Sequence, residues 1–187
     1  MPSAGKLLVA AVGATLLLDA TTPAQSARSQ TLGRVATSHG IRAYDISVAP
    51  DGVGLPQGHG TAADGAVLYA ARCAPCHGAR GEAPDEDYPK LAGGFGTLTS
   101  NAPVLTVGSY WPYATTVWDY IRRAMPYDAP GTLPADDVYA VTAYVLYLNE
   151  IVRETDILDR SSLPKVRMPN RDGFVTDPRP DVPQSPR

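Results

Sequence analysis

Residues 115–124 have the apolar spacing of an amphipathic helix, with apolar side chains recurring every three or four positions. Pro126 is expected to stop this helix, because the residue before a proline disfavours helical geometry. The polar residues are expected to face away from the core, and they are Asp119, Arg122 and Arg123. The apolar stripe consists of Val117, Trp118, Ile121 and Ala124.

A longer helix is predicted from Pro134 to about Val152. Proline suits the first turn of a helix, and the carboxylates of Asp136 and Asp137 favour its positive N-terminal end. The predicted buried stripe consists of Val138, Val141, Val145, Leu148 and Val152.

The start of a third helix is indicated at Thr61, which places a hydroxyl at the cap and a carboxylate, Asp64, three residues later. Val67, Leu68 and Ala71 are expected to share one face. This helix would run directly into Cys73.

The rest of the chain is predicted to be loop, because it shows no clear alternation typical of a strand. The abundance of proline (18) and glycine (17) among the 187 residues supports this prediction. Residues 41–48 are interpreted as extended, and Gly78 to Val107 as a long loop around a cofactor. The fold class is therefore all-α, with three main helices. The predicted organisation is a signal peptide (1–27), an extended N-terminal arm (28–60), a helical domain (61–152) and a Pro-rich C-terminal extension (153–187).

Residues 1–27 have the pattern of an export signal. Lys6 precedes an uncharged apolar run from Leu7 to Leu18, and small residues follow. The run is too short for a membrane span of roughly 17–25 residues. Cleavage after Ala24 and after Ala27 both fit, and an uncleaved anchor is the alternative. Export predicts a periplasmic location.

The C-terminal extension is polar and Pro-rich, but Leu163, Val166, Met168 and Phe174 interrupt it. We expect it to be ordered as far as Phe174, across the domain or on a partner, with residues 177–187 frayed. The net charge of −3 is too small to indicate a nucleic-acid partner.

The stretch Cys73-Ala74-Pro75-Cys76-His77 holds the only two cysteines. A structural zinc site needs about four Cys or His ligands, and no second ligand pair exists. A thiol–disulfide redox site usually follows a strand, and a plain disulfide leaves His77 without a role. Cys-x-x-Cys-His is the signature of covalent haem attachment, in which the thiols of Cys73 and Cys76 bond the haem and His77 binds the iron. We therefore predict one haem c.

A methionine is the expected second axial ligand of this haem. Met125 is favoured because it stands just past a helix end, where a fixed turn can direct its thioether inward. Met168 has similar neighbours and is the alternative, while His39 and His59 lie in Gly-rich segments typical of solvated histidines. Two filled axial positions favour electron transfer over chemistry at the haem.

Further residues are predicted to surround the haem. The carbonyl of Pro89 suits the other ring N–H of His77, and Leu91 would pack on the ring. The propionate groups need hydrogen-bond donors, for which the candidates are Tyr110, Trp111, Arg122 and Arg123.

With these residues assembled, the chain resembles class I cytochromes c across residues 61–152. Residues 49–56, 107–114, 120–126 and 163–174 resemble one branch, the monohaem cytochrome subunit that accompanies molybdenum sulfite dehydrogenases and the Sox-type sulfur dehydrogenase. The resemblance implies the class I cytochrome c fold and a partner subunit that holds molybdopterin and oxidises sulfite or sulfane sulfur. It also implies a second cytochrome c that takes the electrons onward.

Two other functions remain open. A freely diffusing carrier between respiratory complexes needs only a small charged contact patch, and an acidic cluster near the cysteines offers one: Glu82, Asp85, Glu86 and Asp87. A haem enzyme would need an open sixth position or further haems, and the sequence has one Cys-x-x-Cys-His.

Overall fold

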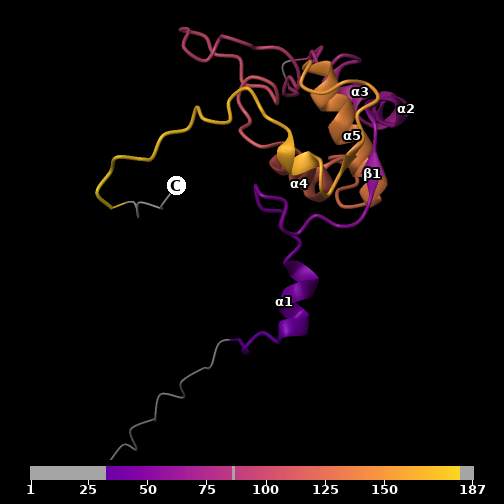
Figure 1. Ribbon diagram of the computed structural model, residues 1–187, viewed down its shortest axis with the longest axis vertical. Helices are drawn as coiled ribbons and strands as arrows, with labels where there is room; N and C mark the ends of the chain where they lie inside the picture. Colours follow the sequence, from indigo (N-terminus) through magenta and orange to yellow (C-terminus); the bar gives the residue numbers. More distant parts are fainter. Residues whose placement is uncertain (1–32, 86, 182–187) are drawn as a thin grey trace, which may run out of the picture. The chain divides into compact units, whose positions relative to one another are not determined.

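The computed structural model describes residues 33–85 and 87–181, and the chain divides into two units between Thr37 and Ser38. The predicted signal peptide lies outside the described residues. The second unit is mostly helical (Figure 1), which confirms the predicted class. Its elements are α1 (Ser38–Tyr44), β1 (His59–Gly60), α2 (Ala62–Arg72), α3 (Ala74–His77), α4 (Ala114–Ala124), α5 (Ala135–Leu148), β2 (Leu158–Asp159) and the 3₁₀ helix η1 (Leu163–Lys165).

Helix α5 is the centre of the core, and α2, α4 and β1 all pack against it. Val138, Tyr139 and Leu146 of α5 are fully buried. This helix is shorter than the sequence predicts: it ends at Leu148, and Val152 is half-buried beyond it. Its predicted stripe is confirmed at Val138, Val141 and Val145, which are all buried.

Helix α2 begins with the predicted cap. The Thr61 hydroxyl accepts the Asp64 N–H, and the Asp64 carboxylate accepts the Thr61 N–H. The predicted apolar face is wrong at two of its three residues, because Val67 is 78% exposed and Ala71 is also exposed, whereas Leu68 is half-buried against the core. The buried residues are Ala62, Gly65 and Tyr69.

Gly65 explains which face of α2 is buried. A Cβ atom on Gly65 would lie 2.0 Å from the carbonyl oxygen of Ala140, so the backbones of α2 and α5 touch at this point. The helices cross where a side chain is absent, and this turns Val67 outward.

Helix α4 ends at Ala124, close to the predicted boundary, and Met125 caps it in extended geometry. Val117, Trp118 and Ile121 are buried as predicted. Asp119 was expected to face solvent, and that expectation is wrong because it is only 6% exposed. The reason is that the N-terminal flank covers this side of α4, and the N–H of Val48 donates to the Asp119 carboxylate.

The N-terminal flank is less extended than predicted. Residues 38–44 form α1, which the Asp45 N–H continues by bonding to the Ile41 carbonyl at 2.8 Å. Further along, β1 pairs antiparallel with β2, with His59 opposite Asp159 and Gly60 opposite Leu158. This short pairing joins the two flanks, and the sequence pattern gives no sign of it.

The C-terminal flank is ordered against the domain as far as Phe174, as predicted. Leu163 and Met168 are at most 1% exposed. The side-chain amide of Asn170 donates to the Tyr110 carbonyl at 2.7 Å, and the rings of Phe174 and Tyr110 lie 5.2 Å apart. The fraying predicted for residues 177–187 falls partly on 182–187, outside the described residues.

Among the described residues, no helix combines the length and the apolar character that crossing a bilayer requires.

Candidate haem site

The two cysteines and the histidine lie on a single helical turn. Cys73 ends α2 and begins α3, and its carbonyl accepts the N–H of Cys76 at 3.1 Å and of His77 at 2.9 Å. Both cysteines are half-buried free thiols. The turn therefore places two thiols and an imidazole together without joining the thiols in a disulfide.

The environment of Cys73 differs from that of a redox-active thiol. Burial raises the pKa of the Cys73 thiol to about 11, and the nearby Arg72 only partly opposes this. Thiol–disulfide enzymes lower the pKa of the attacking cysteine, often at a helix start. A helix precedes this turn, whereas the redox motif usually follows a strand. The structure thus opposes the thiol–disulfide interpretation.

The imidazole of His77 is oriented by a backbone carbonyl. Its Nδ1 lies 3.0 Å from the oxygen of Pro89, the acceptor expected from the sequence. A carbonyl can only accept, so Nδ1 carries the proton and Nε2 presents the lone pair. A histidine that binds a metal through Nε2 is commonly oriented in this way.

Tyr69 holds the turn that follows His77. Its hydroxyl donates to the carbonyl of Gly78 at 3.0 Å, and burial raises the pKa of this phenol above its usual range. Gly78 has a φ of +81°, and a Cβ there would lie 2.5 Å from the carboxyl carbon of Glu82. Sequence reasoning missed Tyr69, since an aromatic residue within a helix is usually core.

Asn149, just after α5, joins the loop at 91–93 to the core. Its amide group donates to the carbonyls of Leu91 (3.0 Å) and Val145 (2.9 Å), and its oxygen accepts the N–H of Gly93 (3.2 Å). The sequence analysis also missed this residue, because a lone Asn near a helix end resembles an ordinary cap. Leu91, predicted to touch the haem, is thereby held at a defined position, half-buried against the core.

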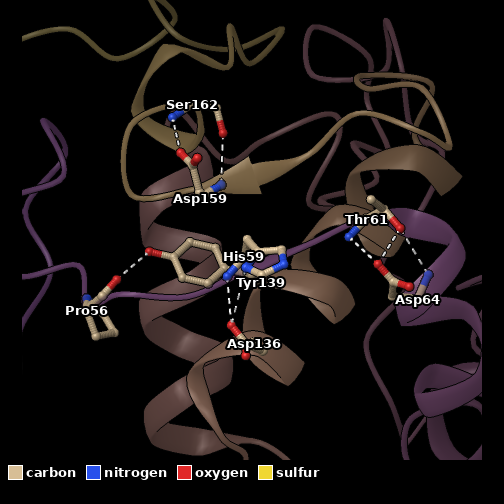
Figure 2. Close-up of polar contacts among 8 residues, drawn as sticks. All are labelled: Pro56, His59, Thr61, Asp64, Asp136, Tyr139, Asp159 and Ser162. Atoms are coloured by element: carbon tan, nitrogen blue, oxygen red, sulfur yellow. Dashed lines mark hydrogen bonds and ion pairs between the residues drawn. The ribbon is translucent and has the colours of Figure 1, made fainter.

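The candidate axial methionines differ in their surroundings. Met125 is half-buried at the end of α4, whereas Met168 is 1% exposed and packed within the core. A side chain enclosed by protein groups on all sides has no face left for a cofactor, so Met168 fits the role of core filler. His39 and His59 are exposed, and the N–H of His59 bonds Asp136 (Figure 2).

The predicted propionate donors have protein contacts in the structure. The guanidinium of Arg122 lies 5.5 Å from the ring centre of Trp118, and Arg123 pairs with Asp119. Trp111 is half-buried and packs edge-on against Tyr120, with ring centres 5.6 Å apart. Their role toward a haem stays a prediction.

The donor set fits a covalently attached haem. Two thiols are available for thioether bonds, and one histidine nitrogen faces away from its carbonyl partner. The indole N–H of Trp118, which is fully buried in the core, is the only buried side-chain polar atom without a hydrogen-bond partner in the described part of the chain. No group of three or more His, Cys, Asp or Glu in residues 33–85 and 87–181 could hold a metal ion alone.

Comparisons with known proteins agree with this chemistry. A sequence model of the cytochrome c family matches residues 62–149. The chain is 32% identical to the thiosulfate dehydrogenase of Allochromatium vinosum over 120 residues, which are 62% of this chain and 38% of that protein. The chain therefore spans less than half the length of this curated relative.

A solved structure matches more of the chain. A chain in the crystal structure of the sulfane dehydrogenase SoxCD from Paracoccus pantotrophus is 46% identical, with a TM-score of 0.74. The match covers 81% of this chain and 74% of that one. At this identity and coverage, the chain belongs to the cytochrome c family: it is an electron-transfer protein with covalently bound haem c, related to the SoxCD dehydrogenase.

Proposed function

We propose that this chain is a periplasmic monohaem cytochrome that accepts electrons from a molybdenum-containing sulfur-compound dehydrogenase. The partner oxidises sulfane sulfur or sulfite, and this chain passes the electrons to another cytochrome c. Residues 1–27, with their export pattern, support the periplasmic location.

The flanks of the domain carry the argument for a specific partner. The family model matches residues 62–149, less than half of the chain, whereas the match to the SoxCD structure covers 81%. Neither flank alone is long enough to supply that difference, so residues on both sides of the domain take part in the match. Features shared with a dehydrogenase complex but outside the general cytochrome domain support a role as a subunit of such a complex.

The proposed site assigns one role to each ligand residue. Cys73 and Cys76 hold the haem through thioether bonds, and His77 and Met125 are the axial ligands. When bound, the haem supplies a one-electron couple between ferric and ferrous iron. A soft thioether ligand favours the ferrous state and raises the reduction potential.

The thiosulfate dehydrogenase relative supports sulfur-compound chemistry in general terms. Because this chain spans only 38% of that protein, we assign the oxidation of the sulfur compound to the partner. The single Cys-x-x-Cys-His and the two proposed axial ligands suit a chain that carries electrons without binding the substrate.

The experiment is purification of the tagged holoprotein from its native periplasm, followed by measurement of molybdenum and haem. We expect about one molybdenum per haem. Addition of sulfite or of a sulfane-sulfur compound should then reduce the haem. A second tagged periplasmic cytochrome purified in parallel is the control. A molybdenum-free protein that exchanges electrons only with other cytochromes would favour the diffusing carrier.

The axial assignment has its own test. The absorption band that arises from sulfur-to-iron charge transfer should disappear in Met125→Ala and persist in Met168→Ala. The reverse result would assign Met168 as the ligand.

A further inference from the structure

Side chains of α4 hold the backbone of the N-terminal flank. The Asp119 carboxylate accepts the N–H of Val48 at 3.2 Å, and the hydroxyl of Thr115 donates to the carbonyl of Pro50 at 3.2 Å. The guanidinium of Arg122 lies 3.5 Å from the carbonyl oxygen of Ile46. These residues share one side of α4, so the flank runs along this helix.

Asp119 is the central residue of these contacts. It is 6% exposed and also forms an ion pair with Arg123, whose side chain is 49% exposed. A buried carboxylate is costly unless it is paired and hydrogen-bonded. Both partners are present, one from the flank and one from α4, so Asp119 couples the flank to the helix.

The C-terminal flank also contacts this segment. A Cβ on Gly52 would lie 2.5 Å from Cγ of Pro164 in η1, which places the turn at Gly52 in close contact with η1. Figure 2 shows the next anchor, where the Tyr139 hydroxyl of α5 donates to the Pro56 carbonyl at 3.0 Å. The antiparallel pairing of β1 with β2 is a further contact between this segment and the rest of the domain. We call residues 46–60 and 158–168 the belt.

The belt is connected to the proposed haem site through the C-terminal end of α4. Met125 follows the last residue of α4, and its N–H still bonds the Ile121 carbonyl at 3.0 Å. Its side chain therefore moves with the helix. A thioether would be a weak ligand to the iron of a bound haem, so its hold on the iron would be sensitive to a displacement of α4.

We propose that Asp119 is a positioning residue that, through the belt, fixes α4 and so keeps the Met125 sulfur in place for the haem iron. This inference rests on the proposed function, in which Met125 is the axial ligand. It goes beyond that function by assigning the flanks a second role within the chain itself.

Competition with imidazole tests the proposal in the full-length holoprotein, because added imidazole binds ferric iron only when the thioether has left it. Asp119→Ala removes the central contact and should raise the apparent imidazole affinity about tenfold, with weakening of the sulfur-to-iron band. Thr115→Val removes one contact to the belt and should raise the affinity about threefold.

Asp156→Ala is the matched control, because Asp156 also forms an ion pair with an arginine, Arg153, on an exposed part of the C-terminal flank. It should leave imidazole affinity unchanged. A purely structural role for Asp119 would lower the denaturation midpoint without changing imidazole affinity, and that result would overturn the proposal. If Asp119→Ala fails to fold, the test rests on Thr115→Val: a raised imidazole affinity supports the proposal, and an unchanged affinity overturns it.

Met125→Ala, measured in parallel, separates the two levels of the argument. If this variant keeps the sulfur-to-iron band, the axial assignment is wrong and the positioning role of Asp119 is overturned with it. If the band is lost and both belt variants bind imidazole like the unaltered protein, only the belt proposal fails.

Discussion

The loop at residues 78–107 and the N-terminal part of the belt, residues 46–60, are both largely irregular, yet they are held differently. The belt buries Val48 and Leu55 in the core, and side chains from α4 and α5 bond its backbone. Both regions also leave apolar side chains in solvent, with Val53 of the belt 68% exposed and Leu105 of the loop 53% exposed, and the loop buries Val107 in the core.

The loop is held largely by local hydrogen bonds, both between backbone groups and with the hydroxyls of Thr97, Thr106 and Ser109. The Leu91 N–H bonds the Gly81 carbonyl at 2.8 Å, and the Val107 N–H bonds the Leu91 carbonyl at 3.2 Å. At Gly94, with a φ of +74°, a Cβ would lie 2.3 Å from the Val104 carbonyl oxygen, so the chain approaches itself too closely for any side chain. The loop is anchored to the rest of the domain by Asn149, by the Tyr69 hydroxyl at Gly78 and by the buried side chain of Val107.

The belt is bonded by side chains of α4 and α5, whereas the loop carries Pro89 and Leu91, which are predicted to lie beside the haem. We therefore expect the loop to gain further contacts when the haem is bound. Burial of apolar surface is the main stabilising contribution in a domain of this kind. We therefore expect the two regions to respond unequally to loss of the haem and to single substitutions.

The largest effect is expected when haem attachment is abolished. In Cys73→Ala/Cys76→Ala, the amides of Leu91 and Val107 should exchange with solvent at least about a hundredfold faster than in the holoprotein, because local opening loses its main opposition. The Val48 amide should keep most of its protection. Hydrogen exchange measured by mass spectrometry checks both, and an equal loss in the two regions would contradict the comparison.

The second largest effect is expected for Asn149→Ala. It leaves the N–H of Gly93 and the carbonyl of Leu91 without their side-chain partner, and we expect the free energy of unfolding to fall by about 3 kcal/mol. Denaturant unfolding of the holoprotein measures this. Asn170→Ala is the control, since its hydrogen bond to Tyr110 is exposed and its loss should lower that free energy by less than about 1 kcal/mol.

In the belt, Tyr139→Phe should lower the free energy of unfolding by about 1 kcal/mol, because it removes one hydrogen bond to Pro56 and leaves the ring in place. Burial raises the pKa of Tyr139 to about 12, so its hydroxyl is a donor throughout the physiological range. Tyr147→Phe, at a position 38% exposed, should be neutral. If the two variants changed the free energy of unfolding equally, the hydrogen bond from Tyr139 to Pro56 would not be what holds this part of the belt.

The smallest effect concerns Asp159 in β2. Hydrogen bonds from Ser161 and Ser162 lower its carboxyl pKa to about 2. Because the folded-state pKa lies below the unfolded value, this stabilisation is present above about pH 4 and is lost as the pH falls toward 2. Figure 2 shows the contacts between Asp159 and Ser162. The free energy of unfolding, measured from pH 5 to pH 2, should fall less steeply in Asp159→Asn than in the unaltered protein. An unchanged pH dependence would argue against the hydrogen bonds from Ser161 and Ser162.

Much of the site could be predicted because it depends on short-range spacing. The Cys-x-x-Cys-His turn, the Thr61–Asp64 cap and the end of α4 before Pro126 each follow from residues within one helical turn of each other. The hydrogen bond from His77 to Pro89 could also be anticipated, because a proline carbonyl lay at a suitable distance along the chain.

The failures concern contacts between distant segments. Asp119 and Arg123 have the spacing of an ordinary surface ion pair, and only the flank that covers them makes the carboxylate buried. The buried face of α2 depends on Gly65 meeting α5, and periodicity alone gives a missing side chain no weight. A strand of two residues, such as β1, is too short to produce any alternation.

The pairing of β1 with β2 also leads to an expectation about folding. β1 precedes α2 and β2 follows α5, so β1 acquires its partner only after the intervening chain has been synthesised. Such a contact has a high sequence separation, and the entropy of closing the chain must be overcome before the contact contributes. We therefore expect β1 and β2 to pair late in folding, after the helices between them have packed together.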